Sequence, residues 1–536
     1  MQIALDHLPY AARRQPVFAP RGVVATSQPL AAQAGLAALR RGGSAVDAAI
    51  AAAVTLTVVE PASCGVGGDA FALVWDGARL HGLNGSGRAP AALSAAIARR
   101  HGPRIPGCGW LPVTAPGAPA AWRDLHARFG RLPFAELFED AIGYAARGFP
   151  LGAIAARGWA GAYRRFEQGL EREAFGHWCG AFAPEGSAPA AGTVWRCADM
   201  AHTLEQLAAS GGAALYTGAL AERIDAHARA TGGWLRAADL AAHASTWVEP
   251  IGTSYRGYDV FEIPPNGQGL AALLALNILE GFDLAGAPRD TGQSYHLQLE
   301  AMKLAFADAH RYIADPERAA VPTAELLSKA YAAERRALIG ERALLPEPGQ
   351  PLKGGTVYLC AADADGMMVS FIQSTYSGFG CGVVVPGTGI ALQNRGEGFS
   401  LEADHPNVLE PGKRPYHTII PGFLMRQGEP IGPFGVMGGH MQPQGHVQMV
   451  VNTLDYGLNP QASLDAPRWS WWEARYAKVE GHAHPAIATE LAARGHDLEV
   501  DDDPEPFGRG QIIWRLPGGG YMAGSDGRGD GCAIGF

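Results

Sequence analysis

The sequence predicts a fold that mixes α-helices with β-strands (α+β), and three stretches carry this prediction. Residues 356–362 and 367–374 are β-rich runs joined by residues 363–366, which contain Asp-Gly, a strong hairpin signal. Residues 45–58 are apolar almost throughout, and a helix that is apolar on every side is buried. Residues 119–236 are alanine-rich and interrupted by glycines, which favours several helices.

Length, charge and cysteine content narrow the classes of protein. A chain of 536 residues can bury a large core, and this length favours more than one domain. The formal net charge of −9 argues against nucleic-acid binding, which requires clustered basic side chains. The seven cysteines are scattered without a Cys-x-x-Cys pair, which favours free thiols in a reducing compartment over disulfides or a zinc site.

No segment of the sequence has the pattern of a membrane or targeting element. The first nine residues lack a basic segment followed by an apolar core, so we expect no signal peptide. The longest apolar run, residues 48–59, is too short to cross a bilayer. We therefore expect a cytoplasmic protein with no membrane partner.

Motifs for cofactors and metals are missing as well. The sequence contains no Walker loop, no His-Glu-x-x-His and no Gly-x-Ser-x-Gly. Residues 65–70 fit a loose dinucleotide fingerprint, but they follow a helix and open a strand, which reverses the required order. His417, His440 and His446 have spacings unlike a compact zinc site and are typical of hydrogen-bonded loop histidines. We expect no metal and no cofactor.

The chain opens with a strand and two helices. A proline in the first turn, a Gly-Gly pair after the last turn, and a serine cap with an aspartate three residues later set the helix ends. In order, these elements and markers are the strand 23–27, Pro29, the helix 30–41, Gly42 and Gly43, Ser44 and Asp47, and the helix 45–58.

Later elements are short strands and buried helices. Runs of β-branched and aromatic residues predict the strands, and the apolar periodicity of the longest segment predicts a helix with one buried stripe. In order these are the strands 71–75 and 249–263, the loop 264–269, and the helices 270–279 and 294–313.

Thr356 is the first candidate for chemistry. It follows Gly354 and Gly355 and opens the predicted hairpin, and a β-branched residue is common at the start of a strand for structural reasons alone. Gly438 and Gly439 form one of several tight glycine turns farther along the chain. Such turns can direct backbone N–H groups at an oxyanion, although on spacing alone a structural turn is equally expected.

Several stretches together resemble the gamma-glutamyltransferase family of N-terminal-nucleophile hydrolases. The similarity covers nearly the whole chain, in order. It is carried by Ser27 to Ala31, residues 42–49, Val59 to Pro61, residues 65–68, 264–269 and 308–311, Asp315 with Pro316, Thr356, Phe379 with Gly380, Gly438 with Gly439, and residues 465–468.

The resemblance implies a four-layer αββα sandwich made by one self-cleaving proenzyme. The cut lies between Gly355 and Thr356, so that residues 1–355 form a large fragment and residues 356–536 a small one, associated in one αββα unit. Thr356 becomes the nucleophile with its own α-amino group as base. Ser374 supports it, and the N–H groups of Gly438 and Gly439 form the oxyanion hole. A dimer of such heterodimers is a further expected assembly.

The positions that hold the substrate in typical family members differ here. The corresponding residues are Ser86 with Arg88 two residues on, Tyr376, Arg395, Gly398, and His417 with Thr418. The family's amine-binding aspartate is missing and an arginine has appeared, which suits an anionic acyl group without an α-ammonium. This pattern resembles the acylase-like branch, which includes cephalosporin (glutaryl) acylases and oxamate amidohydrolase.

Structural alternatives exist for both arginines. Arg88 is equally explained as an unpaired surface residue, and Arg395 as a loop brace paired with Glu397 or Glu402. Glu397 is also a candidate replacement for the missing aspartate, which keeps gamma-glutamyl chemistry open.

Three functions are therefore compared. The first is a self-processing N-terminal-threonine amidohydrolase for small-molecule amides whose acyl group carries a carboxylate, such as glutaryl or oxamate amides. The second is a conventional gamma-glutamyl hydrolase and transferase acting on glutathione and related amides. The third, from another class, is an unprocessed and catalytically inactive binding protein.

Overall fold

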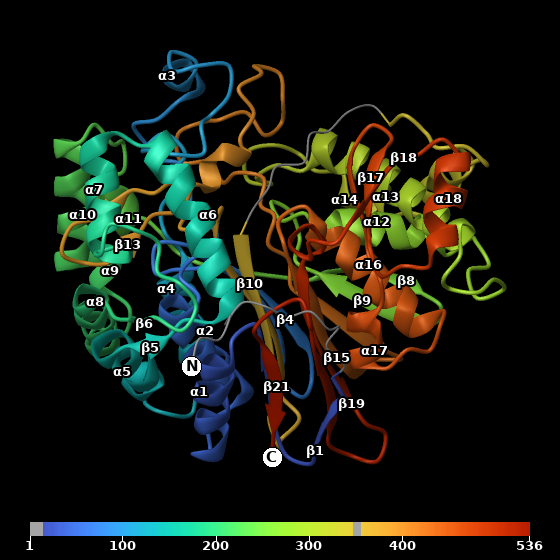
Figure 1. Cartoon of the computed structure of the whole chain (residues 1–536), viewed down its shortest axis with the longest axis horizontal. Helices are drawn as coiled ribbons and strands as arrows, with labels where there is room; N and C mark the ends of the chain where they lie inside the picture. Colours follow the sequence, from blue (N-terminus) through green and yellow to red (C-terminus); the bar gives the residue numbers. More distant parts are fainter. Residues whose placement is uncertain (1–13, 347–354) are drawn as a thin grey trace, which may run out of the picture.

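Figure 1 shows the computed structural model of the chain, which describes residues 14–346 and 355–536. The predicted absence of a signal peptide in the first nine residues lies outside the described part, as do residues 347–354, which include most of the loop before Thr356. None of the helices within the described ranges is long and apolar enough to cross a membrane.

Two seven-stranded sheets form the centre of the molecule, and every strand pairing within them is antiparallel. The first sheet has the order β1 (Val17–Ala19), β20 (Tyr521–Ser525), β19 (Arg509–Arg515), β15 (Glu429–Met437), β14 (Gly422–Arg426), β9 (Tyr258–Glu262) and β8 (Ile251–Tyr255). The second has the order β21 (Cys532–Gly535), β2 (Val23–Thr26), β10 (Gly355–Ala362), β11 (Met368–Tyr376), β3 (Asp69–Trp75), β4 (Leu80–Asn84) and β7 (Thr246–Val248).

Helices cover the outer face of each sheet (Figure 1). Against the second sheet lie α1 (Pro29–Arg40), α2 (Ala45–Val59), α4 (Ala118–Phe129), α5 (Glu139–Arg147), α6 (Ala153–Gly169), α7 (Arg172–Phe182), α8 (Ala198–Ala209) and α10 (Ala219–Ala230). Against the first lie α12 (Gly269–Leu279), α13 (Gly292–Tyr312), α15 (Lys329–Arg336), α16 (Met441–Leu454), α17 (Pro460–Asp465) and α18 (Pro485–Ala493).

Smaller elements complete the fold. Three short sheets lie outside the two central ones: β16 (Trp469–Glu473) with β17 (Tyr476–Glu480) and β18 (Asp497–Asp501), β12 (Val384–Val385) with β13 (Ile390–Ala391), and β5 (Phe149–Pro150) with β6 (Val194–Trp195). Short helices are α3 (Ala95–Ala98), α9 (Ala214–Thr217), α11 (Ala237–Ala241), α14 (Thr323–Leu326), and the single turns η1 (Phe134–Phe138), η2 (Arg395–Gly398) and η3 (Glu505–Phe507).

Three buried cores separate four layers. One core fills the space between the two sheets, where Phe71 and Leu73 of β3 pack with Phe423 of β14 and Ile513 of β19. The other two cores join each sheet to its own helices. The order of layers is therefore helices, sheet, sheet and helices, which confirms the predicted αββα sandwich.

Local predictions at the start of the chain are confirmed. Ser44 and Asp47 form a reciprocal capping box at the start of α2, whose residues are all buried. The predicted hairpin is the central pair β10–β11, with its turn at residues 363–366. The predicted strand 249–263 is itself a hairpin of β8 and β9.

Each sheet combines strands from both sides of position 356. In the second sheet, β2 lies between β21 and β10, and β11 lies beside β3. In the first sheet, β1 pairs with β20, and β9 pairs with β14. The two halves of the chain are thus joined by backbone ladders in both sheets.

Candidate active site

Thr356 lies at an irregularity near the start of the central strand β10. Gly355 pairs with Tyr376 and Val357 with Gln373, so the register shifts at the residue between them. A bulge of this kind redirects a side chain out of the regular alternation of a strand. Thr356 is buried, with 1% of its surface exposed.

Two polar side chains contact the hydroxyl of Thr356. Its Oγ1 lies 3.3 Å from Ser374 Oγ on the neighbouring strand β11, as the hairpin prediction implied. Gln442 Nε2 donates a hydrogen bond of 3.3 Å to the same Oγ1. Because Gln442 Oε1 accepts a hydrogen bond of 2.9 Å from Ile420 N, the amide is oriented with its donor end toward Thr356.

Gln442 was not predicted from the sequence. It lies in the first turn of α16, three residues after Gly439. The sequence does contain a signal for Gln442, because a polar residue in the first helical turn after a candidate oxyanion turn lies close to the site.

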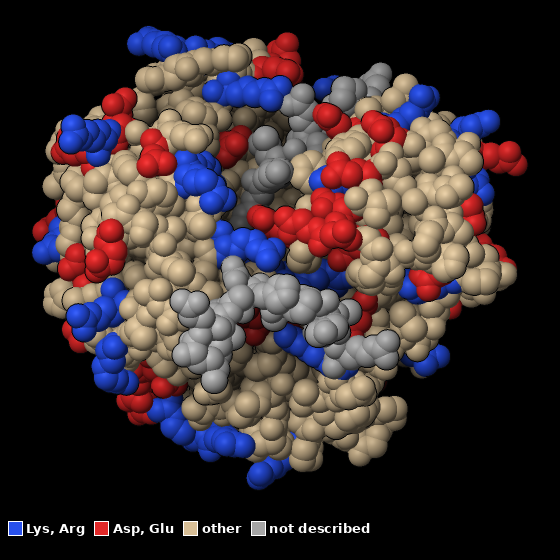
Figure 2. Space-filling view, viewed as in Figure 1, with Lys and Arg blue, Asp and Glu red and all other residues tan. Residues whose placement is uncertain are grey.

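Gly438 and Gly439 form the turn between β15 and α16. Their φ angles are +129° and +63°, in the left-handed region that favours glycine. Gly438 and Thr356 line the same cavity, of about 620 Å³, which we call the nucleophile cavity. Figure 2 shows basic and acidic side chains gathered around a hollow on this face of the molecule.

Arg395 lies directly behind the two hydroxyls. Its Nη2 donates a hydrogen bond of 3.1 Å to Ser374 Oγ, and its Nη1 donates one of 2.6 Å to Thr418 Oγ1. The guanidinium carbon lies 4.4 Å from the centre of the Tyr376 ring, a cation–π contact. Tyr376 reaches this position with a φ of +78°, which is rare for a residue with a side chain.

The buried guanidinium of Arg395 has no counter-charge in contact. Arg395 is 1% exposed, and within residues 14–346 and 355–536 no carboxylate forms an ion pair with it. Its Nε is also buried without a hydrogen-bond partner in that part of the chain. Burial lowers the pKa of Arg395 to about 10, so it remains a cation at neutral pH. Glu397 and Glu402 thus form no ion pair with it among the described residues, although the charges of Asp69 and Glu397 help to hold the pKa of Arg395 up.

His417 is placed differently from Thr418. Its Nε2 lies 3.0 Å from Asp69 Oδ2, its Nδ1 accepts a hydrogen bond from Ile419 N, and the ring packs against Phe71. Like Arg395, and unlike Thr418 and Tyr376, it is not among the residues that line the cavities described here. Both ring nitrogens of His417 are already engaged, so it is a buried, hydrogen-bonded histidine of the wall, and we assign it no contact with substrate.

Asp69 was overlooked by sequence reasoning. Its Oδ1 accepts hydrogen bonds from the backbone N–H groups of Gly87 and Gly117 and from Gln393 Nε2. Burial raises the pKa of Asp69 to about 6. Its location beside Ser374, at the start of β3, follows from the strand register, which the sequence alone does not provide.

Arg88 is neither an unpaired surface arginine nor a neighbour of Arg395. Its guanidinium forms ion pairs with Asp315 at 3.3 Å and with Glu317 at 2.8 Å, and it donates to the carbonyl oxygen of Gly412. The expectation that Arg88 is an unpaired surface residue is therefore wrong. Because two carboxylates already neutralise its charge, it offers little attraction to an anionic substrate.

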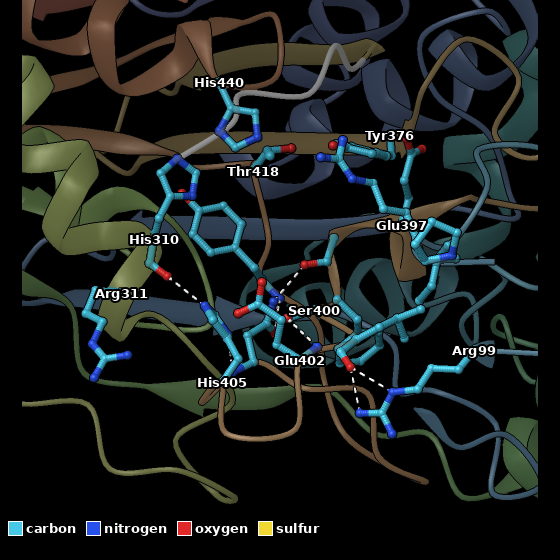
Figure 3. Close-up of a pocket in the computed structure, with 18 of the residues that line it drawn as sticks. Arg99, His310, Arg311, Tyr376, Glu397, Ser400, Glu402, His405, Thr418 and His440 are labelled. Atoms are coloured by element: carbon cyan, nitrogen blue, oxygen red, sulfur yellow. Dashed lines mark hydrogen bonds between the residues drawn. The ribbon is translucent and has the colours of Figure 1, made fainter. Parts of the chain in front are cut away.

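A second cavity, of about 800 Å³, adjoins the first at Glu397, whose side chain lines both. Thr418, Tyr376 and Gly398 line this second cavity together with His310 and His440, and we call it the histidine cavity (Figure 3). The position of the missing aspartate, Gly398, thus lies in the wall of this cavity, where a Cβ would meet the carbonyl oxygen of Tyr416 at 2.8 Å.

One cluster of metal-ligating side chains lies outside these cavities. The ligand atoms of His296, Glu300 and His496 are all within 4.8 Å of one another. The ammonium group of Lys303 already forms an ion pair of 2.6 Å with Glu300. Because this cation neutralises the only carboxylate of the group, we assign the cluster no ion.

Comparisons with known proteins show which family the chain resembles. The family model described as gamma-glutamyltranspeptidase matches residues 31–536. The chain is 36% identical over 530 residues to the glutathione hydrolase-like YwrD proenzyme of Bacillus subtilis, covering 97% of this chain and 99% of that protein. It is 35% identical over 533 residues to the oxamate amidohydrolase proenzyme of Klebsiella pneumoniae, covering 96% and 98%.

A solved structure is similar as well. The crystal structure of cephalosporin acylase from Bacillus halodurans matches with a TM-score of 0.96 and 53% sequence identity, covering 100% of this chain and 99% of that one.

Proposed function

This chain belongs to the gamma-glutamyltranspeptidase family of amide hydrolases, and we propose that it cuts itself before Thr356 and then hydrolyses small-molecule amides whose acyl group carries a carboxylate. The buried, unpaired guanidinium of Arg395, which donates to the hydroxyl that contacts the nucleophile, carries this proposal. The names of two relatives, an oxamate amidohydrolase and a cephalosporin acylase, support it.

The self-cleavage step uses the hydroxyl of Thr356 against the preceding peptide bond. Oγ1 attacks the carbonyl carbon of Gly355, the C–N bond breaks, and the amine of Thr356 leaves with a proton. Water then hydrolyses the resulting ester. The products are a carboxylate at Gly355 and a free α-amino group at Thr356, so that the fragments are residues 1–355 and 356–536, held together in one unit.

The free amine then serves as the base for turnover. Its reference pKa is near ~7.7–8.0, so it accepts a proton from its own Oγ1 at mildly alkaline pH. Oγ1 attacks the substrate carbonyl, and the developing oxyanion faces the N–H groups of Gly438 and Gly439. The leaving amine takes the proton, and water releases the acyl group from the ester. Ser374 and Gln442 hold Oγ1 in position.

The guanidinium of Arg395 lies behind Thr418 and Tyr376, which line the cavity, and the carboxylate of the acyl group would approach it between these two residues. Burying a cation with no carboxylate in contact is costly, so a substrate carboxylate offsets a cost that the free enzyme bears. An α-ammonium at the same place would be repelled. We therefore expect processed enzyme to favour glutaryl and oxamate amides over gamma-glutamyl amides in kcat/KM.

A substrate panel tests the proposal. Glutaryl, oxamate and gamma-glutamyl amides are compared by initial rates with the same processed preparation. A preference for gamma-glutamyl substrates of tenfold or more, about 1.4 kcal/mol, would contradict the proposal. That outcome would favour the second candidate, a conventional gamma-glutamyl hydrolase and transferase, in which Glu397 at the junction of the cavities receives the α-ammonium.

Gln442→Glu should slow both self-cleavage and turnover by at least tenfold, ~1.4 kcal/mol. The glutamate can still accept the hydrogen bond from Ile420 N, but it places an acceptor instead of a donor beside Thr356 Oγ1. A carboxylate there also opposes negative charge on that oxygen. Cleavage is followed by denaturing gel electrophoresis and turnover by single-turnover kinetics.

Gln444→Glu is the matched control. Gln444 lies on the same helix, is equally buried, and accepts a hydrogen bond of 2.7 Å from Trp471 N, while its Nε2 donates to backbone carbonyls. This substitution should lower stability without a comparable loss in the chemical step. Equal losses in both variants would mean that Gln442 acts through folding alone.

A further inference from the structure

The histidine cavity contains polar groups that the proposed chemistry at Thr356 does not use. His440 is 7% exposed, and its Nδ1 is buried without a hydrogen-bond partner in the described part of the chain. The same holds for Nε2 of His310. Buried polar atoms are paired in most proteins, so unpartnered nitrogens on two histidines that both line one cavity require an explanation.

The surroundings of the two rings are aromatic. His310 stacks on Tyr416 at 5.5 Å between ring centres and on Phe306 at 5.6 Å, and His440 stacks on Tyr416 at 5.8 Å. Figure 3 shows His310 and His440 together on one side of the cavity, with Tyr376 and Glu397 on the other side. Planar rings favour further planar groups as neighbours.

Both imidazoles are uncharged at neutral pH. Burial lowers the pKa of His310 to about 4 and holds the pKa of His440 well below its usual range. A neutral imidazole carries one N–H donor and one acceptor nitrogen, and it attracts a carboxylate far less than an imidazolium does. The orphan nitrogens therefore suit an uncharged hydrogen-bonding partner.

We propose that the histidine cavity is a specificity subsite in which His310 and His440 bind an uncharged, planar, hydrogen-bonding group of the acyl side, such as a heteroaromatic ring or a carboxamide. This subsite rests on the proposed function and extends it. Thr418 and Tyr376 contact Arg395 and also line the histidine cavity, so a carboxylate held by Arg395 would lie at the inner end of this cavity. The acyl group would thus carry a carboxylate held by Arg395 and a neutral planar branch that extends into the histidine cavity.

The test compares glutaryl nitroanilides that carry a pyridyl or a phenyl group on the central carbon. The two rings have nearly the same shape, but only pyridine offers a nitrogen to an imidazole N–H. At mildly alkaline pH, kcat/KM for the pyridyl substrate should exceed that for the phenyl substrate by about tenfold, as one hydrogen bond would give. His440→Leu should abolish this ratio.

His405→Leu is the matched control. His405 lines the same cavity, but its Nε2 lies 3.2 Å from the carbonyl oxygen of His310, and its Nδ1 accepts a hydrogen bond from Asn407 N. The pyridyl-to-phenyl ratio should survive in this variant. Self-cleavage and thermal unfolding of both variants show whether each has folded.

A binding measurement separates failure of this subsite from failure of the carboxylate preference. Methylpyridine and toluene, which lack any carboxylate, are titrated into processed enzyme, and the ring ¹⁵N resonances of the histidines are followed. Methylpyridine alone should shift the signals of His310 and His440. Equal rates for the two substituted substrates with no shift would overturn the proposal, leaving water as the partner of both nitrogens. A histidine that becomes protonated when glutarate binds would overturn it too, since the subsite would then be anionic.

Discussion

Thr356→Ala should remain one chain of 56.2 kDa and should have no measurable amidase activity, while the unaltered protein resolves into two fragments. The variant lacks the hydroxyl that attacks Gly355 in the proposed cleavage, and without cleavage no free amine exists at position 356. Denaturing gel electrophoresis with N-terminal sequencing of the smaller fragment measures the result. A new N-terminus anywhere other than Thr356 would remove the assignment of the nucleophile.

Thr356→Ser is the matched control for this substitution. It keeps the hydroxyl that contacts Ser374 and Gln442, so cleavage should continue, more slowly because the serine loses the conformational restriction of the β-branched threonine. If the unaltered protein itself stayed in one piece and inactive, the third function, an unprocessed binding protein, would take the place of the enzyme.

Arg395→Ala should lower kcat/KM for glutaryl and oxamate amides by roughly 10- to 100-fold, the loss of a charge-assisted hydrogen bond worth about 1.5–3 kcal/mol. The rate for gamma-glutamyl amides should fall less, because an α-ammonium gains when the guanidinium is removed. The preference between acyl groups should therefore narrow. Because Arg395 also donates to Ser374, the ratio between substrates is the informative quantity, and any general loss of rate is not.

Arg88→Ala provides the control for the arginine prediction. Both arginines were candidates for anion binding from the sequence, but Arg88 is paired with Asp315 and Glu317. Its removal should affect stability or processing and leave the order of substrates unchanged. A change in substrate order from Arg88→Ala, and none from Arg395→Ala, would transfer the carboxylate site to Arg88.

Sequence reasoning was most successful where the determining contacts are local. The Ser44–Asp47 capping box spans three residues, and the β10–β11 hairpin is set by the turn between its strands. The proximity of Thr356 and Ser374 follows from that hairpin, because the two residues lie on adjacent strands at the same end. Family resemblance supplied the order of layers, which no local pattern in this chain determines.

The electrostatic state of the site could not be predicted in this way. The guanidinium of Arg395 is held by Thr418 and Ser374 instead of an ion pair with Glu397, and these two hydroxyls are brought to it by different parts of the fold. Arg88 was misjudged for the same reason, since its partner Asp315 is 227 positions away in the chain. Gln442 faces Thr356 across the space between helix α16 and strand β10, and no spacing rule connects the two.

Because both sheets combine strands from both sides of position 356, the two fragments have to fold as one chain before they are separated. Halves synthesised from two separate genes would each expose several unpaired strand edges, and such edges promote aggregation. The hydroxyl of Thr356 meets Ser374 within the β10–β11 hairpin, but it meets Gln442 only after the two sheets have packed together. Only a folded molecule should therefore cut itself, and a new N-terminus at Thr356 would show that folding preceded cleavage.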